Sequence, residues 1–228
     1  MSEELTGKSL APYIQHTLID VGLTRARMIQ HAEEALTHGF NAVMVAGSAI
    51  PYVTEVVRGS GVRVASALDF PTCGVMTSAG KAAEAEALVE LGAEEIDCGV
   101  QVGWLKDGRY DEFREDIAGV VRAGVPVKVM LELPLLTDDE KEKAVELSIE
   151  AGAAFLKNAS SGAVETANPD SVKYLVDRAP EGVKVKASGA IKSVTQAREL
   201  IAAGAVLLGT SAGIEIVTDT ADSSTSSY

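Results

Sequence analysis

One unit recurs along this chain: a helix-like segment reaches a glycine, and within a few residues a short apolar run begins. Its clearest copies are HGFNAVMV (38–45), LGAEEIDCG (91–99), AGVPVKVML (123–131), AGAAFLKN (151–158) and AGAVLLG (203–209). Glycine suits the left-handed position that ends a helix before the chain turns into a strand. A chain built from this unit is restricted to folds in which helices alternate with parallel strands.

Weaker copies of the same pattern bring the predicted number of strands to eight. We predict strands over residues 14–18, 40–46, 63–69, 94–99, 127–132, 154–158, 183–188 and 206–209. The intervening segments are rich in strong helix formers, and several begin at a capping residue such as Thr24, Thr137 or Ser193. This alternation predicts an α/β fold, a closed (β/α)8 TIM barrel, with a doubly wound open sheet as the alternative. The open sheet is disfavoured as a dinucleotide-binding fold because no GxGxxG motif follows an early strand.

Length and composition favour a single domain. The chain has 228 residues, of which 46% are hydrophobic, and no linker or shift in composition divides it. We therefore predict one barrel over residues 1–217. The remaining residues, 218–228, read TDTADSSTSSY and are predicted to form a mobile polar tail.

Charge and cysteine content restrict the partners and the compartment. A formal net charge of -13 repels nucleic acid and anionic membranes, so an anionic substrate would have to be captured locally. The N-terminus lacks a signal-peptide pattern, and no apolar run is long enough to span a membrane. We therefore predict no nucleic-acid or membrane partner. Only Cys73 and Cys98 are present and they form no CxxC motif, which predicts a reduced, cytoplasmic protein.

The histidine pattern gives little support to a metal centre. His16 lies in the first predicted strand, whereas His31 and His38 lie in a helical segment and are predicted to be on its surface. Neither an HxH nor an HExxH spacing occurs. We therefore predict no metal site.

Charged side chains gather at the predicted carboxyl ends of the strands, where the chemistry of such barrels takes place. These residues are Asp69, Asp97, Lys128, Glu132, Lys157 and Lys186. Two buried amines on neighbouring strands lower each other's pKa, and a neutral amine can attack a carbonyl to form a Schiff base. Asp97 is then the candidate for moving protons. A buried salt-bridge network without chemistry is the alternative.

Seven stretches of the chain resemble the motifs of class I deoxyribose-phosphate aldolases. They are IQHTLID, ALDFPTCG, EEIDCGV, VKVMLEL, AGAAFLKNASSG, VKVKASGAIKS and LLGTSAG. The resemblance implies a (β/α)8 barrel in which Lys157 forms the Schiff base, Lys186 activates it and Asp97 relays protons. It also implies reversible cleavage of 2-deoxyribose 5-phosphate to glyceraldehyde 3-phosphate and acetaldehyde, with no metal or organic cofactor. A role in proton transfer for the terminal Tyr228, and a homodimer, are further implications.

Around the substrate the family pattern is kept in part. The resemblance and the small or hydroxyl side chains together predict binding of the substrate and its phosphate by Ser160, Ser161, Gly162, Gly189, Lys192, Gly209 and Ser211. The chain departs from the family pattern at Gln15, Asp69, Leu133, Asn158 and Ala190. We expect these departures to cluster where the substrate lies, with Asp69 adding negative charge there. Two alternatives therefore stay open: a lysine-dependent aldolase for another carbonyl compound, possibly unphosphorylated, and a non-catalytic barrel homologue.

Overall fold

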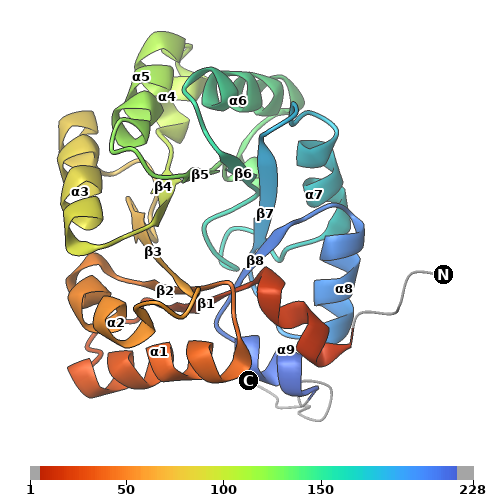
Figure 1. Ribbon diagram of the computed structural model, residues 1–228. Coiled ribbons are helices and arrows are strands. Elements are labelled where there is room, and N and C mark those ends of the chain that lie inside the picture. The colour runs from red at the N-terminus through yellow and green to blue at the C-terminus, as the bar shows by residue number, and fades with distance from the viewer. Residues whose placement is uncertain (1–5, 220–228) are drawn as a thin grey trace.

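Eight parallel strands close into a ring in the computed structural model, which describes residues 6–219 (Figure 1). The strands are β1 (Ile14–Leu18), β2 (Ala42–Val45), β3 (Arg63–Leu68), β4 (Glu95–Gly99), β5 (Val127–Met130), β6 (Phe155–Lys157), β7 (Lys184–Ser188) and β8 (Leu207–Thr210). Each strand pairs with its neighbours in chain order, and β8 returns to pair with β1. The predicted TIM barrel is confirmed, and the open-sheet alternative is wrong.

The helices lie outside this ring, as Figure 1 shows. They are α1 (Arg25–His38), α2 (Ile50–Val57), α3 (Ser78–Leu91), α4 (Val102–Lys106), α5 (Tyr110–Val121), α6 (Asp138–Glu150), α7 (Pro169–Val176), α8 (Val194–Ala202) and α9 (Gly213–Thr218). Short 3-10 helices are η1 (Gly7–Tyr13), η2 (Gly47–Ala49) and η3 (Leu133–Leu135). In the part of the chain that the structure describes, no helix is both long enough and apolar enough to cross a membrane.

The predicted capping residues start and stop the helices. Thr24, Thr137 and Ser193 each accept a hydrogen bond from the backbone N–H three residues further on. Such caps stabilise a helix by about 1 kcal/mol, because they satisfy amides that have no partner within the helix. Gly39 and Gly92 end α1 and α3 with φ values of 68° and 113°, in the left-handed region predicted for them.

Side chains along each strand point alternately into the layer beneath the helices and into the inside of the barrel. In β4, Ile96 and Cys98 face outward into the apolar layer beneath the helices, whereas Asp97 faces into the barrel. In β5, Val127 and Val129 likewise join the apolar layer. The main hydrophobic core therefore lies between the strands and the helices, and the barrel interior is free to carry buried charge.

Candidate active site

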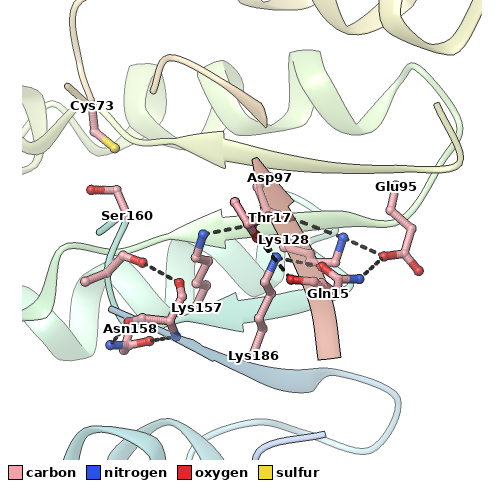
Figure 2. A network of polar contacts seen from close by, with 12 residues as sticks. Gln15, Thr17, Cys73, Glu95, Asp97, Lys128, Lys157, Asn158, Ser160 and Lys186 are labelled. Atoms are coloured by element: carbon pink, nitrogen blue, oxygen red, sulfur yellow. Dashed lines mark hydrogen bonds and ion pairs between the residues drawn. The ribbon is translucent and has the colours of Figure 1, made fainter. Parts of the chain in front are cut away.

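Two lysines and one aspartate meet inside the barrel. The Lys157 amine on β6 donates a hydrogen bond of 2.8 Å to Asp97 Oδ2 on β4, and the Lys186 amine on β7 donates one of 2.7 Å to the same oxygen (Figure 2). Lys157 is 5% exposed, Lys186 1% and Asp97 0%. The structure thus brings together the three side chains that the sequence singled out, and Lys157 is the lysine nearer to solvent.

A second ion pair lies deeper in the barrel. The Lys128 amine is 2.7 Å from Glu95 Oε2 and 3.3 Å from Asp97 Oδ1. Within residues 6–219, this network therefore holds three buried amines, of Lys128, Lys157 and Lys186, against the two buried carboxylates of Glu95 and Asp97. An uncompensated buried charge is costly, so the centre is most stable when one amine is without its proton.

The pKa values in this centre follow from burial and from the charge count. Burial lowers the pKa of Lys186 to about 7, with the charges of Lys157 and Lys128 acting in the same direction and Asp97 opposing them. Burial alone would raise the pKa of Asp97, but the charges of the three lysines hold it well below its usual range. Near neutral pH the Lys186 amine can therefore gain or lose a proton beside an ionised carboxylate.

The lowered pKa of Lys186 predicts a specific dependence of stability on pH. Between about pH 7 and 10.5 the unfolded chain carries a proton on Lys186 that the folded protein lacks. The free energy of unfolding rises with pH wherever the unfolded state binds more protons. Relative to a Lys186→Met variant, the wild-type free energy of unfolding should therefore increase through this window, by at most about 1.4 kcal/mol per pH unit. Urea unfolding of both proteins at several pH values measures the difference, and parallel pH profiles would contradict the lowered pKa.

Above the charged centre a cavity of about 190 Å³ opens at the carboxyl ends of the strands. Lys157, Lys186 and Asp97 contribute to its lining. So do all seven predicted substrate-binding residues, which are Ser160, Ser161, Gly162, Gly189, Lys192, Gly209 and Ser211. The cavity lining thus combines hydroxyl groups and the Lys192 amine with the two amines of the charged centre.

Comparison with known proteins identifies the family. A deoxyribose-phosphate aldolase from Staphylococcus haemolyticus is 40% identical to this chain over 209 residues, which are 91% of this chain and 94% of that protein. One from Staphylococcus carnosus has the same identity and coverage. The chain belongs to the deoxyribose-phosphate aldolase family.

A solved structure agrees with this assignment. The deoxyribose phosphate aldolase from Aeropyrum pernix, described as a unique tetrameric structure, is 28% identical to this chain with a TM-score of 0.85. The match covers 94% of this chain and 92% of that one. A search of family models gave no match.

The departures from the family pattern lie at different depths around the cavity: Ala190 lines it, whereas Gln15 and Asn158 contact the lining residues Lys186 and Ser188. Among the described residues, Ala190 is the one departure in the cavity lining, where its φ of 47° is a conformation that favours glycine. Leu133 borders a different hollow, beside α7. Gln15 lies beneath the cavity, hydrogen bonded to Lys186.

Asp69 and Asn158 have structural contacts. The Asp69 carboxylate accepts hydrogen bonds from the backbone N–H groups of residues 74–76 and pairs with buried Lys81 at 2.8 Å. It therefore fixes the turn after β3 and does not add charge to the cavity. The Asn158 amide links β6 to β7, because it accepts from the Ser188 N–H at 2.9 Å and donates to the Ser188 carbonyl at 3.0 Å.

Two glycines in the lining are required by packing. A Cβ atom at Gly189 would lie 2.0 Å from the Glu165 carbonyl oxygen, and the φ of Gly189 is 122°. A Cβ atom at Gly209 would lie 3.0 Å from Cε of Lys186. Gly209 thus leaves room for the Lys186 side chain, a role that the sequence did not reveal.

Glu95 is the member of the charged centre that the sequence analysis missed. It lies two residues before Asp97 in the same strand, so the two side chains share the inward face. That spacing is the signal that could have found it. The Gln15 amide and Arg63 also contact Glu95, so that Glu95 connects the interior of the barrel to its partly exposed amino-terminal end.

The histidines form a separate group between β1 and α1. His31 is 1% exposed and stacks on His16 with ring centroids 4.1 Å apart, so the prediction that it lies on the surface is wrong. His16, His31 and Glu34 place three potential metal ligands within 4.8 Å of one another. However, Glu34 Oε2 already contacts His16 Nε2 at 3.1 Å and the Arg27 guanidinium at 3.3 Å. Burial lowers the pKa of His31 to about 4, and His16 and Arg27 provide hydrogen-bond partners for the Glu34 carboxylate.

Proposed function

We propose that this protein is a class I aldolase that reversibly cleaves 2-deoxyribose 5-phosphate to glyceraldehyde 3-phosphate and acetaldehyde. The observation that carries the proposal is the pair of buried amines on one carboxylate oxygen at the floor of the cavity. Lys157 is assigned as the Schiff-base lysine because it is the more accessible of the two and lies at the end of its strand. The proposal implies Schiff-base chemistry and a place in the breakdown of deoxyribonucleotides.

The reaction begins with attack of a neutral Lys157 amine on the aldehyde carbon of the open-chain sugar. Loss of water gives an iminium ion, which accepts the electron pair of the neighbouring carbon–carbon bond as that bond breaks. The hydroxyl on the far carbon loses its proton, and glyceraldehyde 3-phosphate leaves as the aldehyde. The remaining enamine takes up a proton at carbon, and water releases acetaldehyde and restores the amine.

Proton movement is assigned to Asp97 and Lys186. Both amines donate to Asp97 Oδ2, so a proton lost from Lys157 can reach Lys186 through a single oxygen. The pKa of about 7 for Lys186 suits a group that must accept and return a proton near neutral pH. Asp97 carries the proton only during this transfer; it is ionised before and after it, and then stabilises the positive charge of the iminium ion.

Lys192 and Ser211 are proposed to hold the phosphate, with Gly189 and Gly162 allowing its close approach. Because the protein carries a net charge of -13, a local cation is needed to capture an anionic substrate. We expect 2-deoxyribose 5-phosphate to be turned over at least roughly a hundred times faster than deoxyribose at equal concentration. Lys192→Met should reduce kcat/KM for the phosphorylated sugar by about tenfold and leave that for deoxyribose unchanged.

Initial rates with both sugars and both proteins test this assignment. Equal rates with the two sugars would instead support a related aldolase for an unphosphorylated carbonyl compound. Absence of turnover with either sugar, in protein whose fold is verified by circular dichroism, would support a non-catalytic barrel homologue.

Several assignments remain predictions from the sequence. Tyr228 lies outside the described residues, and its assistance in proton transfer is proposed from the resemblance alone. The domain limits at residues 217 and 218 are also proposed, as are a homodimer and a cytoplasmic location. The location rests on the cysteine pattern, and the structure records Cys73 and Cys98 as free thiols.

A further inference from the structure

The side-chain amide of Gln15 joins the two halves of the charged centre. Gln15 lies on β1, is 0% exposed, and accepts a hydrogen bond of 2.6 Å from the Lys186 amine through Oε1. Its Nε2 donates one of 2.6 Å to Glu95 Oε2 (Figure 2). A carboxylate oxygen can only accept, so the Nε2 side must face Glu95. The orientation of the amide is therefore fixed, with its oxygen toward Lys186.

The negative charge in contact with the Lys186 amine comes from Asp97, and Asp97 also binds other amines. Asp97 on β4 lies 2.7 Å away and also binds Lys157 on β6, and Lys128 on β5 adds further positive charge. On β8, the neighbouring residue is Gly209, which has no side chain. The other carboxylate, Glu95, is engaged by Lys128 and Arg63. Gln15 thus supplies the second acceptor of the Lys186 amine without supplying a charge.

We propose that Gln15 is a positioning residue that holds the Lys186 amine against Asp97 while leaving the centre one negative charge short. The amide fixes where the amine lies, and the missing charge lets the amine exist without a proton. The effect of Gln15 on the position and protonation of the Lys186 amine does not depend on the reaction, whereas the consequence for catalysis rests on the proposed function. In that function, the neutral Lys186 amine takes the proton that the Lys157 ammonium loses before it attacks the substrate.

An isosteric carboxylate at this position should reverse the effect. Gln15→Glu would give the centre a third carboxylate in contact with Lys186, and an opposite charge at hydrogen-bonding distance favours the protonated amine. The oxygen that replaces Nε2 loses the hydrogen bond to Glu95 and faces its Oε2, and the side chain of Asn41, 3.3 Å from Gln15 Nε2, can turn its amide to donate to the new carboxylate. Gln15→Met is the matched neutral variant, because it removes the acceptor without changing the charge count.

The pH dependence of kcat/KM, measured from about pH 6 to about pH 10, distinguishes these variants. For Gln15→Glu we expect the acidic limb of the kcat/KM profile to shift to higher pH by at least about one pH unit. Activity should be roughly tenfold lower at pH 7 and should recover at alkaline pH. For Gln15→Met we expect kcat to fall by about tenfold, with no upward movement of the limb. A merely structural role of Gln15 would lower activity in both variants without moving the limb in either.

A titration of the Lys186 side chain by NMR separates this inference from the proposed function. The signal is assigned by its loss in Lys186→Met, and Gln15→Glu should titrate at higher pH than wild type. An unchanged titration in Gln15→Glu would overturn the inference. A shifted titration with an unshifted activity profile would support the role of Gln15 and contradict the proton-accepting role of Lys186. If Gln15→Glu does not fold, wild-type kcat in Gln15→Met would overturn the inference by itself.

Discussion

Replacing Lys157 with methionine is expected to lower kcat for cleavage of 2-deoxyribose 5-phosphate by at least roughly ten-thousandfold. The methionine fills a similar volume but has no amine to attack the aldehyde. The fold should be retained, because the substitution leaves two buried amines, Lys128 and Lys186, with the two carboxylates. The free energy of unfolding should therefore be equal to or higher than that of wild type.

Lys184→Met is the matched control for this variant. Lys184 lies at the exposed start of β7, so its loss should change neither kcat nor the fold. Steady-state kinetics that detect glyceraldehyde 3-phosphate, together with thermal denaturation, measure both quantities. More than about one tenth of wild-type kcat in folded Lys157→Met would contradict the assignment of the nucleophile.

Replacing Asp97 with asparagine should reduce both activity and stability. Three amines would then remain near the single buried carboxylate of Glu95, and breaking a buried charge pair on one side costs about 3 to 5 kcal/mol. We expect kcat to fall about a thousandfold as well, because the proton path between the amines is lost. Urea unfolding and steady-state kinetics on the folded protein give the two values.

The pH dependence of the Asp97 contribution can be checked with the same variant. The pKa of Asp97 is lowered in the folded protein from an ordinary value of 3.8, so its stabilising contribution is present above that value. It is lost as the pH falls through the folded pKa. The stability difference between wild type and Asp97→Asn should therefore shrink in strong acid.

Asp116→Asn separates catalysis from stability. Asp116 is a buried carboxylate that pairs with buried Lys81 at 2.7 Å, and neither side chain lines the cavity. Asp116→Asn should destabilise the protein by about as much as Asp97→Asn does, while the folded enzyme keeps near wild-type kcat. Equal losses of kcat in both variants would show that Asp97 acts only through the fold.

The barrel could be predicted because its signals are local. Each glycine that ends a helix adopts a left-handed conformation that its position requires, and the capping threonines act through backbone groups three residues away. The predicted carboxyl ends of the strands then placed Lys157 and Lys186 at the same end of the barrel. These patterns depend on the spacing of residues along one element, and that spacing can be read directly from the sequence.

Side-chain contacts between different elements of the fold could not be predicted in this way. Asp69 follows β3 with a φ of 53°, and its carboxylate turns toward the backbone of the next turn and away from the cavity. His31 looks polar in the helical pattern, but stacking on His16 buries it. Both outcomes depend on contacts between elements, and the periodicity of residues along one element does not predict such contacts.

Borohydride trapping tests the central claim, a Schiff base on Lys157, most directly. The protein is incubated with acetaldehyde or with 2-deoxyribose 5-phosphate and reduced, and the modified peptide is located by mass spectrometry. We expect an added ethyl group on Lys157 after acetaldehyde, an adduct on the same residue after the sugar phosphate, and none in Lys157→Met. An adduct confined to Lys186, or no adduct on Lys157 from either compound, would rule out Lys157 as the Schiff-base lysine.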